Sequence, residues 1–564
     1  MTDPNQPTAD LPVPAKDEVL FAALGGLGEI GMNLALYGHA GKWLAVDMGV
    51  TFGDEDTPGV DVIVPDISAI EALGDDLVGI LITHAHEDHI GAVPYLAGRF
   101  KCPVYASPFA AAFLRKKLED DGGAGAKRKV KIIEVKSPGT KKIAPFNIQM
   151  VPMPHSIPES NLVAIRTKAG MVVHSGDWKM DDGPVIGPKP DAEALAKLGE
   201  EGVAALVCDS TNVLREGWTG SESSLTQPIE ELIKSRKNRV IFACFSSNVA
   251  RLYTVAKAAQ AAGRDIGLVG RSLWRMHGVA GGLGYLDGLP DFLQENDIGY
   301  LPRGKMVAIC TGSQGEPRAA LHRIADGQHR HLTLERGDTV CFSSRDIPGN
   351  EKAIGRLQNR LIESGIEVIT ASMEDIHVSG HPAQGEIKRL YELLQPERVL
   401  PAHGEGRHLI AHAAFAKDCG IPESMVAFNG HVVRLAGGDF KKVGDVKVGR
   451  VGLDGKTPVA LNGDALRERR RMKIEGMAHI TVVLDDRGRL AADSMVTLSG
   501  LDAADDDDVL DVIEESIDDA ITAMKPGDRK KDDPVHEAAR TALRRVLRRE
   551  TGKRPQVSVH VVRL

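Results

Sequence analysis

The length, composition and charge of this chain exclude several classes of protein. With 564 residues it is too long for a single hydrophobic core, so three or more folding units are expected. Hydrophobic residues make up 42% and charged residues 26%, a globular composition, and the formal net charge of −9 does not indicate a surface coated in nucleic acid. No apolar run approaches the ~18 residues of a membrane-spanning helix, so no membrane partner is expected.

The N-terminal residues and the cysteines indicate the cytoplasm. Residues 1–16 are polar and proline-rich without the apolar segment of a signal peptide, and they predict a disordered tail. The six cysteines are scattered singly, which argues against a disulfide framework and against a thiolate zinc site. A cytoplasmic location is therefore expected.

From residue 17 onward, short apolar segments alternate with helical stretches and glycine-punctuated loops. Over residues 17–219 several apolar segments end in a polar cluster, which predicts an α/β architecture with its sites at strand ends. Residues 220–370 repeat the alternation of strand and helix in the manner of a doubly wound domain. Residues 371–450 return to strands that end in polar residues.

The last part of the chain predicts a separate small α/β domain. Residues 451–475 are charged, contain glycine and predict a linker. Residues 476–564 combine a hairpin around residues 486–488, an apolar helical stripe and an alternating terminal strand. Two groups of arginines, within 469–471 and 544–549, are interpreted as solvated faces offset by acidic neighbours.

The strand predicted over residues 77–83 ends in HAHEDH, which places His84, His86, Asp88 and His89 in one tight turn. Imidazole nitrogen and carboxylate oxygen suit zinc at ~2.0–2.2 Å, and two cations ~3.5–4 Å apart can bind the attacking and departing oxygens of a displacement together. With 19 histidines and 78 acidic residues in the chain, this spacing is expected by chance only about 0.003 times. The motif therefore predicts a two-metal site.

Three further polar residues follow apolar strands and are candidates to complete two metal sites. They are His155 in VPMPHSIPES, Asp177 in VVHSGDWK and His403 in LPAHGE. Any one of them alone would more often be a hydrogen-bonded polar residue than a ligand. Their occurrence in this order after HAHEDH indicates that they bind metal.

The order and wording of these motifs resemble the metallo-β-lactamase superfamily, which implies an αββα sandwich. The resemblance assigns the ligands of two zinc ions: His84, His86 and His155 for one, Asp88, His89 and His403 for the other, and Asp177 as the bridge between them. It also matches Asp47, at the end of KWLAVD, to the acid that supports the HAHEDH loop from behind the ligands. A turn or cap acid is the alternative role for Asp47.

The insertion resembles the β-CASP nuclease branch of that superfamily. The chain leaves the metallohydrolase fold after CDSTN (208–212) and returns at HVSGH (377–381), and the late motifs of the branch match Asp209, His381 and His403. Longer stretches, among them GGLGEIGMN, HAHEDHIGAVPYL, TGSQGEP and SSRDIPGNE, resemble the bacterial ribonuclease J family, as does the small C-terminal domain. The implied fold is a metallo-β-lactamase sandwich with an inserted doubly wound β-CASP domain and a small α/β C-terminal domain.

This resemblance implies a zinc-dependent ribonuclease that acts on single-stranded RNA in rRNA and mRNA maturation and decay. A 5′-to-3′ exonuclease that prefers 5′-monophosphate ends is expected, with endonucleolytic cuts as a second activity. Two Zn²⁺ per subunit are expected, with Mn²⁺ or Mg²⁺ also able to support activity. A homodimer or homotetramer, and protein partners in RNA degradation, are further expectations.

Within the resemblance, Asp177, His381 and Asp209 have catalytic roles. His381 is the candidate general acid for the leaving 3′-oxygen, and Asp209 would orient its imidazole and favour the charged form. Alternatively, His381 and Asp209 chiefly complete the surroundings of the second zinc. The expected 5′-phosphate pocket consists of Ser246, Ser247 and Asn248 on one side and His377, Val378, Ser379, Gly380 and His381 on the other.

Other interpretations of these motifs stay open. Ser and Asn before a helix also predict an N-cap at 246–248, and that role is compatible with phosphate binding. A DNA-directed β-CASP nuclease would carry the same metal motifs, because nothing in them shows how a 2′-OH is sensed. An RNA-binding scaffold without catalysis is the third hypothesis, and the intact set of candidate ligands argues against it.

Overall fold

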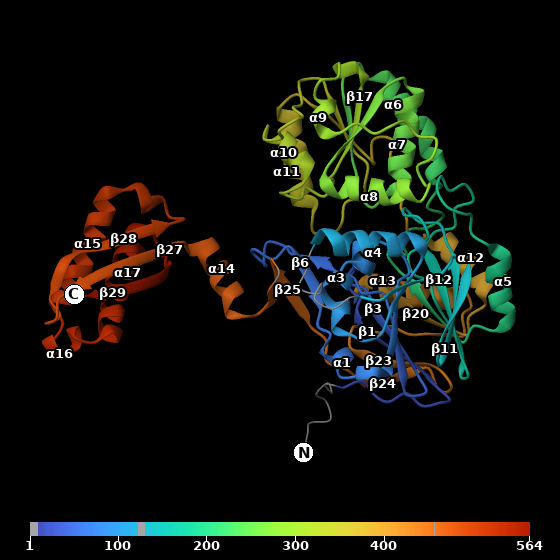
Figure 1. Ribbon diagram of the computed structural model, residues 1–564, viewed down its shortest axis with the longest axis horizontal. Coiled ribbons are helices and arrows are strands. Elements are labelled where there is room, and N and C mark those ends of the chain that lie inside the picture. Colours follow the sequence, from blue (N-terminus) through green and yellow to red (C-terminus); the bar gives the residue numbers. More distant parts are fainter. Residues whose placement is uncertain (1–9, 122–129, 456) are drawn as a thin grey trace. The chain divides into compact units, whose positions relative to one another are not determined.

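The structure, a computed structural model, describes residues 10–121, 130–455 and 457–564 (Figure 1). Contacts divide the chain into two compact units, one made of residues 1–51 and 64–449 and the other of residues 52–63 and 450–564. The first unit contains two large sheets and an inserted smaller sheet, and the second contains the C-terminal domain.

The first sheet of unit 1 has eight strands in the order β24-β23-β1-β3-β4-β7-β8-β9. Its strands β4, β7, β8 and β9 run parallel to one another, so their carboxyl ends share one edge. Its members are β1 Val19–Gly25, β3 Leu34–His39, β4 Lys42–Val46, β7 Leu77–Leu81, β8 Val104–Ala106, β9 Ile132–Glu134, β23 His431–Ala436 and β24 Lys441–Asp445.

The second sheet of unit 1 has seven strands in the order β10-β11-β12-β13-β14-β20-β22. Here β13, β14 and β20 are parallel neighbours, although residues 210–397 separate β14 from β20 in the sequence. The strands are β10 Gly139–Ile143, β11 Phe146–Pro152, β12 Asn161–Thr167, β13 Gly170–His174, β14 Ala205–Asp209, β20 Arg398–Ala402 and β22 Glu423–Ser424.

The two sheets enclose one hydrophobic core. Phe21 and Leu44 of the first sheet pack in the same buried cluster as Ile148, Val163 and Leu400 of the second. Outside the sandwich, α5 (Ala192–Glu201) and α12 (Gln384–Leu394) cover the second sheet, and α4 (Pro108–Asp121) packs on β8 and β9. This arrangement of helix, sheet, sheet and helix confirms the expected αββα sandwich.

The inserted domain is a five-stranded parallel sheet in the order β16-β17-β15-β18-β19. Helices α6 and α7 lie on one side of it and α10 and α11 on the other (Figure 1), which is the doubly wound arrangement. The elements are α6 Thr226–Ser235, β15 Val240–Ala243, α7 Val249–Ala261, β16 Asp265–Val269, α8 Arg271–Gly282, β17 Met306–Cys310, α10 Ala320–Ala325, β18 Thr339–Phe342, α11 Glu351–Glu363 and β19 Glu367–Thr370.

Unit 2 contains the β25–β26 hairpin, a connecting helix and a three-stranded sheet. Residues 451–475, for which a linker is expected, contain β26 (Thr457–Ala460), most of β25 (Arg450–Asp454) and α14 (Asp464–Glu475). The terminal sheet has the order β28-β27-β29, and the apolar stripes of two helices cover it. These elements are β27 Met477–Leu484, β28 Leu490–Ser499, α15 Asp507–Thr522, α17 Asp532–Glu550 and β29 Gln556–Arg563.

Two further expectations concern the N-terminal tail at residues 1–16 and membrane-spanning helices. Residues 1–9 of the expected tail lie outside the described residues, whereas residues 10–16 lie against the β3–β4 turn, where Ala40 N–H donates to the carbonyl of Ala15. Leu11 is buried there. Among the described residues, no helix combines the length and the apolar character that crossing a bilayer requires.

Candidate active site

The HAHEDH loop lies where the parallel strands β4 and β7 end. His84 follows β7, and the short helix α2 (Glu87–Ile90) begins directly after His86. Asp47 follows β4, and its Oδ2 lies 2.7 Å from Nδ1 of His89 while its Oδ1 accepts a 2.8 Å hydrogen bond from Thr83 N–H. Asp47 therefore contacts the loop through Thr83 and His89, and its left-handed φ of 64° marks a backbone constraint of the kind found at functional sites.

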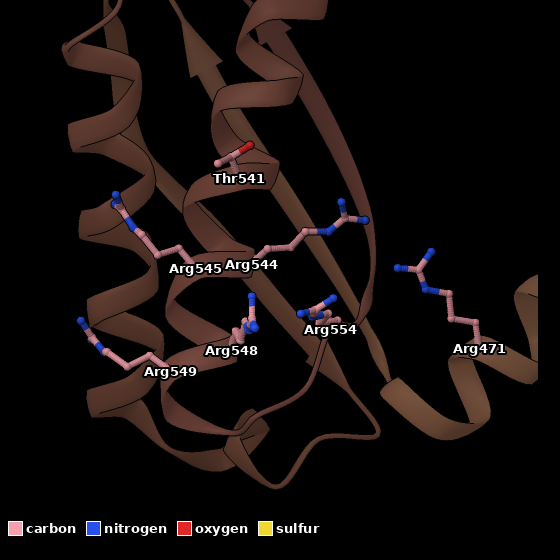
Figure 2. Close-up of a pocket in the computed structure, with 7 residues that line it drawn as sticks. All are labelled: Arg471, Thr541, Arg544, Arg545, Arg548, Arg549 and Arg554. Atoms are coloured by element: carbon pink, nitrogen blue, oxygen red, sulfur yellow. The ribbon is translucent and has the colours of Figure 1, made fainter.

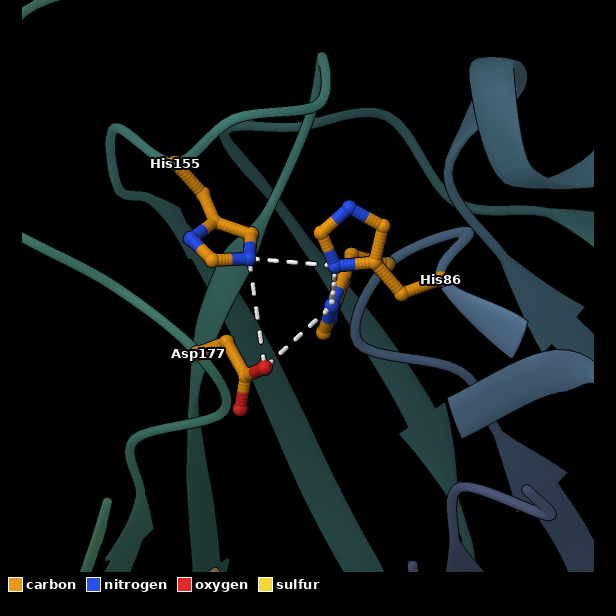
Figure 3. A group of neighbouring side chains, drawn as sticks. His86, His155 and Asp177 are labelled. Atoms are coloured by element: carbon orange, nitrogen blue, oxygen red, sulfur yellow. Dashed lines mark hydrogen bonds and ion pairs between the residues drawn. The ribbon is translucent and has the colours of Figure 1, made fainter. Parts of the chain in front are cut away.

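His84, His86, His155 and Asp177 form the first group of candidate metal ligands, with one ligand atom of each lying within 4.8 Å of the others. Nδ1 of His86 is 3.1 Å from Nε2 of both His84 and His155. Oδ2 of Asp177 is 3.7 Å from Nε2 of His84 and 3.9 Å from Nε2 of His155. Figure 3 shows His86, His155 and Asp177 pointing toward one another from three separate segments.

Asp88, His89, Asp177 and His403 form the second group. The same Oδ2 atom of Asp177 lies 3.2 Å from Nε2 of His89 and 3.5 Å from Nε2 of His403. Asp88 completes the group, with its Oδ2 3.4 Å from Nε2 of His89 and 3.7 Å from Nε2 of His403. The structure thus brings all the predicted ligands together in two groups that share one carboxylate oxygen.

Hydrogen bonds from the outer ring nitrogens orient several of these histidines. Nδ1–H of His155 donates to the Gly380 carbonyl at 2.6 Å, and Nδ1–H of His403 donates to Oδ1 of Asn33 at 3.0 Å. In both cases Nε2 is left as a lone-pair donor that faces the centre of its group. Metal-binding histidines are oriented in this way.

The two groups suit divalent cations. Oδ1 of Asp177 is buried without a hydrogen-bond partner, which is costly for a carboxylate unless a cation compensates it. Nδ1 of His86 lies at hydrogen-bonding distance from Nε2 of both His84 and His155, and one ring proton cannot satisfy both contacts. Imidazole and carboxylate donors of this kind bind zinc and related divalent metals.

The electrostatics of the groups favour positive charge at their centre. Burial lowers the pKa of His86 to about 4 and that of His84 well below its ordinary value, so both rings are neutral, as metal ligands must be. Burial opposes ionisation of Asp177, but the charges of His403 and His89 outweigh it and hold the pKa of this carboxyl well below its usual range. Burial likewise opposes a charge on His89, but Asp177 and other carboxylates raise its pKa.

His381 and Asp209 form a pair beside the second group. Parallel strands β14 and β20 end side by side, which places Asp209 next to His403, and Nδ1 of His381 lies 2.8 Å from Oδ2 of Asp209. Burial lowers the pKa of His381, but Asp209 and Asp177 outweigh that effect and raise it to about 9. The side chain of His381 is 23% exposed whereas Asp209 is fully buried, so an oriented and protonated imidazole reaches the solvent side of the groups.

The two flanks of the expected 5′-phosphate pocket lie close to the metal groups. Asn248 caps α7 by accepting a 2.8 Å hydrogen bond from Arg251 N–H, which confirms the N-cap prediction, and Ser246 and Ser247 are half-buried before it. On the other flank, a side chain at Gly380 would come within 2.6 Å of the His155 ring, so this position requires glycine. Ser379 accepts hydrogen bonds from His381 N–H and from the Asn212 amide.

Comparison with known families covers almost the whole chain. Family models match residues 34–240 (metallo-β-lactamase superfamily), 237–361 (ribonuclease J, β-CASP domain), 365–422 (Zn-dependent metallo-hydrolase RNA specificity domain) and 464–564 (ribonuclease J C-terminal domain). Ribonuclease J of Sinorhizobium meliloti is 42% identical over 554 residues, which is 97% of this chain and 98% of that protein. The chain belongs to the ribonuclease J family.

Other relatives agree with this assignment. Ribonuclease J of Mycolicibacterium smegmatis is 38% identical over 536 residues, covering 94% of this chain and 93% of that protein. A crystal structure of a protein of unknown function from Enterococcus faecalis matches with a TM-score of 0.52 at 14% identity, covering 74% of this chain and all of the other. That likeness concerns the fold alone.

Three residues that support the site in this ribonuclease J family member escape the sequence predictions. Asn33 contacts both His403 and the backbone carbonyl of Asp88, although it lies in the GGLGEIGMN stretch that marks the resemblance. Asn212, in CDSTN, holds Ser379 and the carbonyl of His381. Arg251 is fully buried and donates to the carbonyl of Ile376, at the start of the HVSGH turn. The residues that they contact are distant in sequence. Only their positions within the family motifs could have indicated a role for these three residues.

Proposed function

We propose that this protein is a metal-dependent ribonuclease that hydrolyses phosphodiester bonds of single-stranded RNA from the 5′ end. The observation that carries the proposal is the position of Asp177 Oδ2 between two groups of oriented histidines. The match of residues 365–422 to an RNA specificity domain and the names of the relatives support RNA as the substrate. Two Zn²⁺ are the proposed cofactors, held by the residues of the two groups, with Mn²⁺ or Mg²⁺ as functional substitutes.

When bound, divalent cations at such a site lower the pKa of water and stabilise negative charge on a phosphoryl oxygen. The chain itself supplies the proton. His381 donates it to the leaving 3′-oxygen, because its Nδ1–H is held by Asp209 and its Nε2 is free to face the substrate. Against the effect of burial, the Asp209 carboxylate raises the pKa of this imidazole and so favours the protonated form that a general acid requires.

Replacing His381 with glutamine is expected to slow RNA hydrolysis about 10²–10⁴-fold, the usual contribution of general acid catalysis, while metal content stays unchanged. Asp209→Asn should have a smaller effect in the same direction. The diagnostic measurement is hydrolysis of bis(p-nitrophenyl) phosphate, whose leaving group needs no protonation, so His381→Gln should be nearly as active as wild type on it. Equal losses on both substrates would instead place His381 and Asp209 among the groups that complete the second metal site.

The end preference is tested with matched 5′-monophosphate and 5′-triphosphate RNAs and a 5′-monophosphate DNA of the same sequence. Mononucleotides are expected from the monophosphate RNA only, because the pocket between 246–248 and 377–381 accommodates a single terminal phosphate beside the metal groups. Equal degradation of both RNAs would contradict the assignment of a 5′-phosphate pocket to these residues and would favour endonucleolytic cutting. Preference for the DNA would establish the DNA-directed alternative, and inactivity on every substrate with Zn²⁺ or Mn²⁺ would establish the scaffold.

The cellular setting belongs to the same proposal. All six cysteines are free, which supports a reducing cytoplasm as the location. Action in rRNA and mRNA maturation and decay, together with other proteins of RNA degradation, follows from the proposed substrate. Assembly into a homodimer or homotetramer stays a prediction.

A further inference from the structure

A hollow in the C-terminal domain is lined almost entirely by arginine. Its lining residues are Arg471, Thr541, Arg544, Arg545, Arg548, Arg549 and Arg554, and its volume of about 680 Å³ lies within the roughly 300–1,000 Å³ of ligand sites (Figure 2). All of these residues belong to unit 2. Neither the family match of this domain nor the proposed chemistry assigns a role to them.

The fold of the domain builds this hollow from three segments. Arg471 lies on α14, Arg544 and Arg548 lie one turn apart on α17, and Arg554 lies in the loop before β29. The end of α14 is tied to that loop, because Glu475 accepts a 2.7 Å hydrogen bond from Arg554 N–H and the Ile474 carbonyl accepts one from Lys553. In Figure 2 the side chains of Arg471 and Arg544 extend toward each other, and Arg554 lies below Arg544.

Several arginines that line this hollow differ from their neighbours in sequence in having no ion-pair partner. Arg469 pairs with Asp454 and Arg470 donates to the Leu461 carbonyl, so these two hold α14 to the β25–β26 hairpin. By contrast, the side chains of Arg471, Arg544, Arg548 and Arg554 have no carboxylate partner among the described residues. Arg471, Arg548 and Arg554 are exposed and Arg544 is half-buried, as a solvated face requires, but these four, which we call the arginine hollow, have no acidic ion-pair partner among the described residues.

Within the arginine hollow, the half-buried Arg544 is the side chain whose charge is least compensated. Burial and the charges of Arg471 and Arg540 lower the pKa of Arg544, and its Nε is buried without a hydrogen-bond partner. Like charges one helical turn apart, as at Arg544 and Arg548, also destabilise a helix. An anionic ligand would remove both penalties.

We propose that the arginine hollow binds the phosphate backbone of single-stranded RNA, an inference that rests on RNA being the substrate of this protein. Planar guanidinium groups bind phosphate oxygens in pairs. The described lining has no aromatic ring on which a base could stack, so contact through guanidinium groups and phosphate is the mode that this surface favours. A protein partner is less suited, because protein interfaces depend on apolar and aromatic groups at their core, and the lining offers none.

The test uses the full chain with Asp177→Asn as the parent protein, so that RNA is not consumed. Two variants of this parent are compared, each with three further arginine substitutions. The first has Arg544, Arg548 and Arg554 changed to glutamine. The control has Arg487, Arg489 and Arg563 changed to glutamine, which removes the same charge from the same domain. These three lie at the Leu484 end of β27, about 23 Å along the strand from the end that adjoins α14.

Binding of a single-stranded RNA of about 30 nucleotides is measured by fluorescence anisotropy across a range of salt concentrations. The first variant should bind about tenfold more weakly near 0.15 M salt, and its slope of log Kd against log salt should fall by about 2, since each phosphate contact on a single strand contributes about 0.7. The control should stay within about twofold of the parent. Equal weakening of both variants, or of neither, would overturn the inference.

Two further measurements separate the remaining outcomes. If the first variant binds RNA normally but changes the molecular mass seen by light scattering, the arginine hollow contacts an acidic protein surface and the RNA inference is wrong. Hydrolysis of the same RNA by the chain with intact Asp177 tests the proposed function independently. A chain that hydrolyses RNA while the first variant binds normally disproves only the arginine hollow, whereas weakened binding without any hydrolysis supports the hollow and disproves the nuclease.

Discussion

Asp177→Asn is expected to reduce kcat/KM for RNA hydrolysis about 10³-fold or more and to reduce the divalent metal bound per chain. Asparagine keeps the shape of the side chain but replaces a charged oxygen with a neutral amide. That oxygen faces His84 and His155 in one group and His89 and His403 in the other, so the substitution weakens both at once. Because the cations would supply most of the stabilisation of phosphate charge, activity and metal content should fall together.

A matched control lies four residues away. Asp181 is also buried, and it pairs with Lys179 at 3.0 Å and accepts from Glu222 N–H, but it contacts none of the candidate ligands. Asp181→Asn should therefore retain its metal and keep activity within about fivefold, while losing some stability. Metal content is measured by elemental analysis and activity with 5′-monophosphate RNA. An Asp177→Asn protein with two metals and near-normal turnover would falsify the shared-ligand assignment.

The ligands could be predicted because their positions depend on short-range rules. HAHEDH is a continuous motif after a strand, and parallel strands place their carboxyl ends at one edge. The pairing of β4 with β7 brings Asp47 to His89, and the pairing of β14 with β20 brings Asp209 to His403. Neither pairing can be seen directly in the sequence, and the order of the strand-end motifs led to the proposed ligands only together with the resemblance to the metallo-β-lactamase superfamily.

The features that could not be predicted depend on contacts between distant segments. The short strands of residues 450–460 share a sheet with β6 (Val62–Pro65), which lies almost 400 residues earlier in the sequence. Strands of four or five residues are too short to show a clear alternation, and the charged residues of α14 between 464 and 475 made the segment resemble a linker. The arginine hollow shows the same limit, since acidic neighbours along α17 do not pair with Arg544 or Arg548 in space.

Arg251 links the inserted domain to the segments on both sides of it. It lies on α7 and is fully buried, and its guanidinium donates 2.8 and 3.0 Å hydrogen bonds to the two carboxylate oxygens of Glu222. It also donates to the carbonyls of Ser343, after β18, and of Ile376. One side chain therefore connects the segment that leads into the inserted domain, the end of strand β18 and the segment that leads out of the domain.

Replacing Arg251 with methionine is expected to destabilise the inserted domain by about 3–5 kcal/mol, because the buried Glu222 carboxylate loses its cationic partner and keeps the weaker Thr254 hydroxyl, and the Ser343 carbonyl loses its guanidinium donor. Hydrogen exchange of peptides from α7 and β18 measures the local loss. The control is Arg166→Met, which removes a comparable bidentate pair with Glu201 at a much more exposed position and should cost less than about 1 kcal/mol. Equal costs at the two positions would contradict the role assigned to Arg251.

The double variant Glu222→Leu/Arg251→Met decides whether the ion pair or its hydrogen bonds to the backbone matter more. If the unpaired carboxylate dominates, removing it as well should recover about 2 kcal/mol relative to the sum of the single changes. The carbonyl of Ile376 loses its Arg251 donor in either case and keeps only the Ser343 hydroxyl, so the HVSGH turn that carries Ser379, Gly380 and His381 is held less firmly. Stability should then recover in the double variant while RNA hydrolysis does not, because the imidazole of His381 is positioned through that turn.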